Sequence, residues 1–146
     1  MGTAGAVESV YIPAEDGSRA TLCVSSQVGC KMNCLFCMTG KQGFTAHLTA
    51  AQILNQVLSI PESESLTNVV LMGSGEPFDN YDEVSKFLRL LNAENGLHIS
   101  LRNVSLSTCG LVPGVDRLIA DELWVTLTFS LHAPTDAKRS SIMPVN

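Results

Sequence analysis

Short apolar runs alternate with amphipathic stretches along most of this chain, and that alternation limits the folds it can adopt. Strand-like runs are predicted at residues 68–73, 103–107 and 124–130, with helices before, between and after them. Strands that alternate with helices in this way pair in parallel through right-handed crossovers. The sequence therefore predicts an α/β fold, either a barrel or a doubly wound sheet.

The helices are predicted from their starting residues and their apolar spacing. Thr49 is the predicted N-cap of a helix that Pro61 ends, and Asn80 with Glu83 predicts a capping box for the next helix. A short helix is predicted over 115–120, and another start signal stands at Asp136. Each strand is thus followed by a helix.

The N-terminal part is predicted to be β-structure. Residues 8–13 and a second run from Ala20 flank a turn at 15–18, which predicts a short hairpin, and the second strand is expected to continue to 27–29. We interpret 1–18 as a β extension and 19–146 as the main domain. Because four parallel strands would leave an open edge, we expect the domain to be truncated at its C-terminus, with more strands beyond Asn146.

Composition and charge restrict the class of protein. The chain has 146 residues, 45% of them hydrophobic and 16% charged, which suits one globular domain with a sizeable core. Its net charge of −5 argues against a protein that coats nucleic acid by charge alone, so an RNA substrate would need contacts from elsewhere. Neither a membrane span of about 18 apolar residues nor a signal peptide is recognisable. The expected location is cytoplasmic.

Three of the five cysteines, Cys30, Cys34 and Cys37, form a C-x3-C-x2-C loop directly after a predicted strand. Such clustering does not fit the spread disulfide framework of a small secreted protein. Three thiolates can hold three irons of a cubane cluster and leave the fourth iron open to a cofactor or substrate. The alternative is structural zinc, which needs a fourth ligand; His47 is the nearest histidine, and its surroundings do not resemble a zinc knuckle.

Other polar residues follow the remaining predicted strands. Gly75 and Glu76 come after the second core strand, Ser107 ends the third, and Ser130 and His132 follow the fourth. The carboxyl ends of parallel strands meet at one edge, which carries the site in barrels and doubly wound sheets alike. Taken alone, the two serines fit structural roles, His132 fits a packed or surface histidine, and Gly75-Glu76-Pro77 fits an ordinary turn.

The cysteine triple resembles the signature of the radical S-adenosylmethionine (SAM) superfamily. Further segments resemble the RlmN-type methyltransferases, which act on adenine C2 of 23S rRNA and tRNA, and their C8-directed relatives of the Cfr type. The resemblance runs from about Glu8 to Asn146 and is carried by 19–30, 73–77, 106–108, 130–134 and 143–146. It implies a partial (β/α) radical SAM barrel.

The resemblance also implies roles for single residues. Cys30, Cys34 and Cys37 would bind a 4Fe-4S cluster, Cys23 would be a resolving thiol that breaks a covalent RNA-protein intermediate, and Glu8 would accept a proton. The residues that would bind S-adenosyl-L-methionine are Gly75, Glu76, Ser107, Ser130, Leu131 and His132. Without the resemblance, Cys23 is a small buried strand residue, Glu8 is a solvated carboxylate, and Cys109 is structural.

The implied reaction consumes two equivalents of SAM, because an adenine C-H carbon is too weak a nucleophile for ordinary methyl transfer. One equivalent would methylate a protein cysteine beyond Asn146, and the other would give a 5′-deoxyadenosyl radical. The implied partners are 23S rRNA, tRNA and an electron donor such as flavodoxin or ferredoxin, with a monomeric protein. We expect an RNA-binding domain to be missing and this chain alone to bind a cluster weakly and not to methylate RNA. Alternatives are a C8 methyltransferase, a glycyl-radical activase and a non-catalytic metal-binding module.

Overall fold

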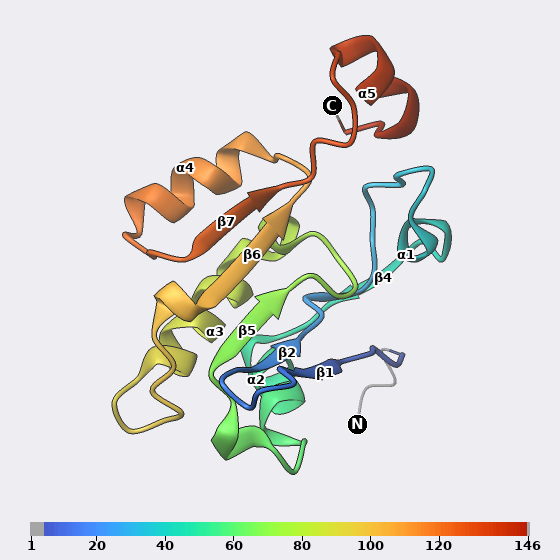
Figure 1. Ribbon diagram of the computed structural model, residues 1–146. Coiled ribbons are helices and arrows are strands. Elements are labelled where there is room, and N and C mark those ends of the chain that lie inside the picture. The colour runs from blue at the N-terminus through green and yellow to red at the C-terminus, as the bar shows by residue number, and fades with distance from the viewer. Residues whose placement is uncertain (1–4, 146) are drawn as a thin grey trace.

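A five-stranded sheet runs through the computed structural model, which describes residues 5–145 (Figure 1). Its strands lie in the order β1-β2-β5-β6-β7, and only β1 is antiparallel to its neighbour. The predicted α/β fold with a parallel core is confirmed. The strands are β1 Val10–Pro13, β2 Ala20–Cys23, β5 Asn68–Leu71, β6 Val104–Thr108 and β7 Thr126–Phe129.

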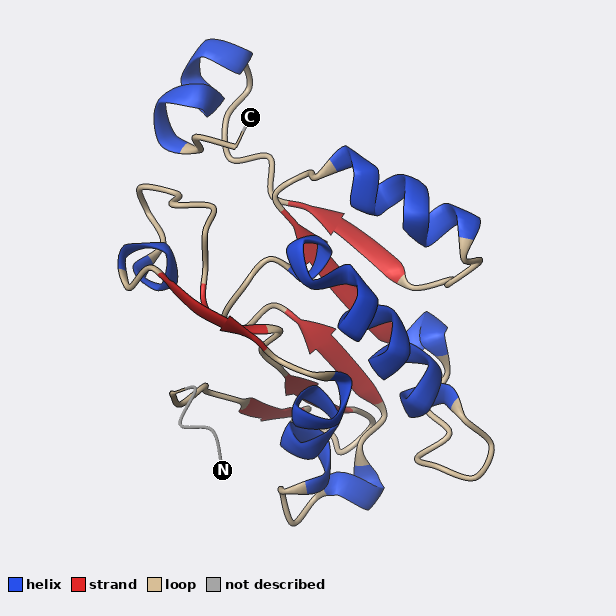
Figure 2. Cartoon of the chain, turned by 180° about the vertical axis from the view of Figure 1, so that it is seen from behind, coloured by secondary structure: helices blue, strands red, loops and turns tan. Residues whose placement is uncertain are grey.

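Helices α2 and α3 lie against one face of this sheet, in front of it in Figure 2. The helices are α1 Met38–Lys41, α2 Ala50–Leu58, α3 Tyr81–Asn92, α4 Val112–Ala120 and α5 Asp136–Ile142. Three 3-10 turns join the elements, at Ser63–Ser65, Pro77–Asn80 (η2) and Leu101–Asn103. No helix within residues 5–145 is long and apolar enough to span a bilayer.

The core lies between the sheet and these helices. Leu22, Val69, Val104 and Leu106 on the strands are fully buried, as is Phe87 on α3. In β5 and β6 the buried residues alternate with half-buried ones, because successive side chains of a strand point to opposite faces. Burying one such side chain contributes about 1.5–3 kcal/mol. The helix-covered face therefore holds the sheet together, and the other face is left for smaller and more polar residues.

The predicted continuous strand from Ala20 to Gly29 is wrong. Strand β2 ends at Cys23, and β3 (Gln27–Gly29) leaves the sheet to pair antiparallel with β4 (Phe44–His47). The break is stabilised because Ser26 donates its backbone N–H to the Ser74 carbonyl, 2.9 Å away, beyond the end of β5. Strand propensity does not predict this break, because Ser74, the residue that stabilises it, lies 48 positions further along the chain. The β3-β4 hairpin carries the cysteine loop between its strands.

Two predicted helix caps had different outcomes. Thr49 caps α2 through a capping box with Gln52, as its N-cap assignment predicted. The predicted box of Asn80 and Glu83 is wrong, because the Asn80 amide donates instead to the carbonyls of Ser26 and Leu48. Those two carbonyls are buried and need a donor. Satisfying them stabilises the fold more than a side-chain cap at the start of α3 would.

Candidate functional site

A cavity of about 230 Å³ lies at the carboxyl ends of the parallel strands. Two groups of residues face each other across it: residues 30–37, here called the cysteine wall, and residues 73–76 with 107–110, here called the strand-end wall. Eight of the eleven residues predicted for the site line the cavity: Cys30, Cys34, Cys37, Gly75, Glu76, Ser107, Ser130 and His132. The structure therefore brings together residues that are up to 102 positions apart in the sequence.

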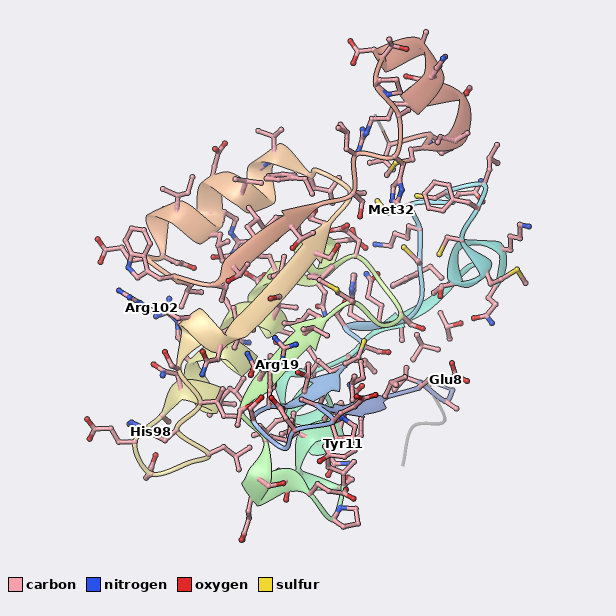
Figure 3. All side chains as sticks on the ribbon, in the orientation of Figure 1. Glu8, Tyr11, Arg19, Met32, His98 and Arg102 are labelled. Atoms are coloured by element: carbon pink, nitrogen blue, oxygen red, sulfur yellow. The ribbon has the colours of Figure 1, made fainter. Side chains whose placement is uncertain are left out.

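The cysteine wall is shaped mainly by backbone hydrogen bonds. Cys30 donates its N–H to the Gly43 carbonyl at 3.1 Å, and Cys37 donates to Cys34 at 3.0 Å. Gly29 has φ 75°, and a Cβ there would lie 1.8 Å from the Gly43 oxygen, so this turn requires glycine. Figure 3 labels Met32 in this wall, close to α5, whereas His98 and Arg102 lie at the far end of the sheet.

The donor set of this wall fits an iron-sulfur cluster. All five cysteines are free, and the three of the C-x3-C-x2-C motif are half-buried on one side of one cavity. Within residues 5–145, no three His, Cys, Asp or Glu side chains already converge on a metal position. His47, the fourth ligand that zinc would take from this region, does not line the cavity and contacts the Gln27 amide instead. Three thiols without that histidine match a cluster with one open iron.

Burial raises the pKa of the Cys30 and Cys34 thiols, and the neighbouring cysteines and Glu76 raise it further. Cluster ligands must be thiolates, so iron binding has to release protons here.

The strand-end wall is centred on Glu76, which is buried at 4% exposure. Its carboxylate accepts hydrogen bonds from the Thr108 hydroxyl at 2.7 Å, from the Cys109 N–H at 2.8 Å and from the Phe78 N–H at 3.0 Å. The Cys109 thiol donates to it as well, and burial together with this carboxylate raises the pKa of that thiol. A carboxylate offers about four lone-pair positions, so Glu76 is almost saturated by the protein itself.

The end of β7 closes the cavity next to the cysteine wall. The Ser107 and Ser130 hydroxyls are 3.4 Å apart, and the His132 ring lies 4.5 Å from the Phe36 ring of the cysteine wall. Helix α5 is followed directly by Met143, which is almost fully buried against the cavity.

Arg139 was not predicted for the site, although it holds two strand ends together. From α5 it donates hydrogen bonds to the carbonyls of Cys109 and Ser130. Thr108 was also missed, although it lies in the segment 106–108 that carries the resemblance, and Cys109 was interpreted as structural. Their role depends on Glu76, 32 and 33 positions away.

Three predicted site residues do not line the cavity. Leu131 is exposed, and Cys23 lies on β2, half-buried, where its thiol hydrogen-bonds to the Met72 backbone and burial raises its pKa. Met72 itself lines the cavity, which places Cys23 next to it. Glu8 lies at the outer end of β1, with its carbonyl bonded to the Ser25 hydroxyl (Figure 3).

Comparison with known proteins agrees with this geometry. Residues 24–145 match the model of the Radical SAM superfamily. The chain belongs to this superfamily. Radical SAM proteins use SAM and a 4Fe-4S cluster, and the family predicted from the cysteine triple is thereby confirmed.

Similar radical SAM proteins share both sequence and structure with the chain. It is 60% identical over 139 residues to a protein of Parabacteroides distasonis and 49% identical over 142 residues to one of Carboxydothermus hydrogenoformans, both named probable dual-specificity RNA methyltransferase RlmN. Those alignments cover 95% and 96% of the chain but 40% and 41% of the relatives. The crystal structure of a radical SAM methyltransferase from Sphaerobacter thermophilus superposes with a TM-score of 0.90 at 43% identity, over 96% of this chain and 42% of that one.

Proposed function

We propose that this chain forms the cluster- and SAM-binding part of an RNA methyltransferase that modifies C2 of adenine in 23S rRNA and tRNA. The observation that supports this most is one cavity lined by three free cysteines and by the ends of β5, β6 and β7. The relatives named RlmN support RNA as the substrate and C2 as the target over the Cfr-type C8 position. Because the chain spans about 40% of those relatives, the activity is a proposal for the complete protein.

In this proposal the two walls have different tasks. Cys30, Cys34 and Cys37 would hold three irons of the 4Fe-4S cluster. When bound, the cluster and SAM together supply a 5′-deoxyadenosyl radical. Gly75 would face the methionine part of SAM, since it lines the cavity, and its missing Cβ leaves room for the Gln27 side chain that packs behind it.

Glu76 would bind the methionine ammonium of SAM by exchanging a hydrogen bond. Of its present donors, the Cys109 thiol is the weakest and is the one an ammonium would displace, while Thr108 and two backbone N–H groups keep the carboxylate in place. A buried carboxylate that gains a cation is stabilised, because burial disfavours an unpaired charge.

The remaining predicted residues would act around SAM and the RNA base. The Ser107 and Ser130 hydroxyls can donate to the carboxylate or ribose of SAM, and His132 lies beside them in the cavity lining. The exposed Leu131, between Ser130 and His132, would contact SAM from the rim. Cys23 would attack the sulfur of the methyl-carrying cysteine of the complete protein. A disulfide would form as the bond from that sulfur to the carbon on the RNA breaks, and the electron pair of that bond would leave with the RNA product, which takes up a proton. Glu8 would accept the proton lost from the base carbon. We also propose a monomer in the reducing cytoplasm, supplied with electrons by a flavodoxin- or ferredoxin-like donor.

The test uses protein expressed from its complete reading frame, purified and reconstituted with iron and sulfide without oxygen. It is incubated with SAM, a reduced electron donor and unmodified 23S rRNA or tRNA, and the digested RNA is analysed by mass spectrometry. The expected product is 2-methyladenosine. Formation of 8-methyladenosine would assign the Cfr-type reaction, and an unmodified RNA in the presence of SAM cleavage would contradict RNA methylation.

A further inference from the structure

The two walls of the cavity belong to different substructures. The cysteine wall lies within the β3-β4 hairpin, and the strand-end wall belongs to the main sheet. A cofactor that chelates a cluster iron and also contacts Gly75–Glu76 has to touch both walls at once. Its affinity therefore depends on how firmly the hairpin is held against the sheet.

Gln27 is the residue at which hairpin and sheet meet. Its side chain is fully buried at 0% exposure, three residues before Cys30. Its Oε1 accepts a hydrogen bond from the Glu76 N–H at 2.8 Å, and its Nε2 donates to Asp79 Oδ2 at 2.7 Å and to His47 Nδ1 at 3.0 Å. One amide thus joins the backbone of the strand-end wall, η2 and the second strand of the hairpin.

Gln27 also packs directly against the strand-end wall. A Cβ on Gly75 would lie 2.7 Å from the Gln27 Cβ, so the Gln27 side chain occupies the space that a side chain at residue 75 would need. The Gln27 N–H donates to the Ser74 carbonyl at 3.1 Å. Lys31, in the cysteine wall, adds a second link through its ion pair with Asp79 at 3.0 Å.

We propose that Gln27 is a positioning residue that fixes the cysteine wall against Gly75–Glu76 and thereby sets the affinity for SAM bound between them. This rests on the proposed function. An amide is needed because it accepts from Glu76 and donates twice on its other side. Glutamate lacks the two donors, and leucine lacks donors and acceptor alike.

Gln56 offers a matched control. Its amide also makes three hydrogen bonds, accepting from the Ser25 N–H and the Ser9 hydroxyl and donating to the Ser25 carbonyl, each at 2.9 Å. None of these bonds is made to the cysteine wall or to Gly75–Glu76; the Ser25 hydroxyl, which accepts from the Ser74 N–H, is not bonded to Gln56. A change at Gln56 therefore reports the general cost of losing such an amide.

The experiment measures the dissociation constant of SAM, without RNA, from the change that SAM causes in the electron paramagnetic resonance spectrum of the reduced cluster. In Gln27→Leu we expect this constant to rise about tenfold, which corresponds to 1.4 kcal/mol. Iron content and the spectrum without SAM should stay as in the natural protein. In Gln56→Leu the constant should stay within about twofold, because the Gln56 amide makes no bond to the cysteine wall or to Gly75–Glu76. An unchanged constant in Gln27→Leu, or an equal rise in both variants, would overturn the proposal.

A second pair of variants decides the question if Gln27→Leu does not fold. Gln27→Glu keeps the acceptor for Glu76 but faces Asp79 with a like charge, so SAM affinity should fall about tenfold. Adding Asp79→Asn restores a hydrogen bond between the two positions, with the amide at residue 79 as donor and the carboxylate at residue 27 as acceptor. The dissociation constant of SAM should then return to within about threefold of the natural value. No recovery in the double variant contradicts the positioning role.

These measurements separate the two proposals. A natural protein whose cluster responds to SAM but which leaves RNA unmethylated refutes the proposed function, and the role of Gln27 stands. A cluster whose spectrum SAM does not change refutes both.

Discussion

The two walls of the cavity are built in different ways. The strand-end wall is tied internally: Glu76 alone accepts hydrogen bonds from Phe78, Thr108 and Cys109 and is buried. The cysteine wall has Leu35 and Phe36 more than half exposed. Its contacts to other elements are made at its edges: the Leu35 N–H donates to the Ile142 carbonyl at 2.9 Å, Phe36 lies against His132, and Lys31 pairs with Asp79. The strand-end wall is thus held by its own buried hydrogen bonds, whereas the cysteine wall is held at its edge through Gln27 and Lys31 and keeps exposed side chains.

The difference follows from what each wall has to hold. A carboxylate can be buried at low cost only if donors surround it, so its wall must be complete before any cofactor arrives. Thiols that become metal ligands need no internal partner, because metal binding itself provides the stabilising energy. The following experiments test this contrast, from the largest expected effect to the smallest.

Replacing a cysteine of the cysteine wall should have the largest effect. Cys34→Ala should lower iron content and SAM cleavage by more than about 100-fold, beyond the 10–100-fold that outer-shell partners of metal ligands cost. The unfolding midpoint of the metal-free protein should hardly move, because this wall is partly exposed. Iron analysis, SAM cleavage and thermal unfolding provide the readouts.

The matched control for that prediction is Cys109→Ala, since Cys109 lines the same cavity but belongs to the strand-end wall. It should keep the iron and lose fold stability instead. If Cys109→Ala lost the cluster as Cys34→Ala does, Cys109 would be a ligand and the division into two walls would be incorrect.

Alanine substitutions at two glycines, one in the strand-end wall and one in the β3-β4 hairpin, compare how tightly the two substructures are packed. Gly75→Ala places a Cβ 2.7 Å from Gln27 at φ 109°, and it should lower the free energy of unfolding by about 3 kcal/mol from strain and overpacking. Gly43→Ala in the hairpin has φ 74° with no atom within 4 Å of the new Cβ, so about 1 kcal/mol is expected. Denaturant unfolding measures both, and equal losses would show that the strand-end wall is not the tighter one.

Removing one donor from Glu76 should have a moderate effect. Thr108→Val keeps the shape but takes away the hydroxyl that donates to Glu76 and accepts from the Gly110 N–H, and should cost about 1–3 kcal/mol of unfolding free energy. Thr126→Val, at an exposed position of β7, should stay within about 0.5 kcal/mol. A loss at residue 126 as large as at 108 would mean that the carboxylate network is not the cause.

The smallest effect is expected at the ion pair between Lys31 of the cysteine wall and Asp79 of η2. Burial opposes ionisation of Asp79, but hydrogen bonds from Lys31 and Gln27 outweigh it and hold the pKa of this carboxyl below its ordinary value of 3.8. A lowered pKa stabilises the fold above the unfolded-state pKa, and this contribution is lost as pH falls through the folded-state value. Lys31→Met should therefore cost up to about 1 kcal/mol at neutral pH, since Lys31 is 44% exposed.

The pH dependence provides the check on that substitution. Unfolding free energies of the natural protein and Lys31→Met should converge as pH falls below 3.8, where Asp79 becomes protonated in both. A difference that stays constant through this range would mean that Lys31 acts through its cation–π contact with the Phe44 ring, 4.4 Å from its amine, and not through Asp79.

Local patterns in the sequence were sufficient for most of the elements and of the cavity lining. Parallel strands end at one edge, so residues that follow them, such as Ser107 and His132, could be placed together from their positions along the chain. The cysteine triple resembled the radical SAM signature because its three cysteines lie within eight residues, and the superfamily is confirmed. The positions of the strand ends and the spacing of the cysteines both depend on residues close together in the chain, so the sequence alone reveals them.

Tertiary structure alone decided how the walls are held. Nothing in the local sequence predicts the hairpin that carries the cysteines. The same holds for two hydrogen bonds: that from the Glu76 N–H to the Gln27 side chain across 49 residues, and that from the Asn80 side chain to the Ser26 carbonyl across 54 residues. Buried polar groups must find partners wherever the fold brings them, and that choice overrides propensities and caps. The sequence thus determined which chemistry gathers at the strand ends, and long-range hydrogen bonding determined the geometry in which it is presented.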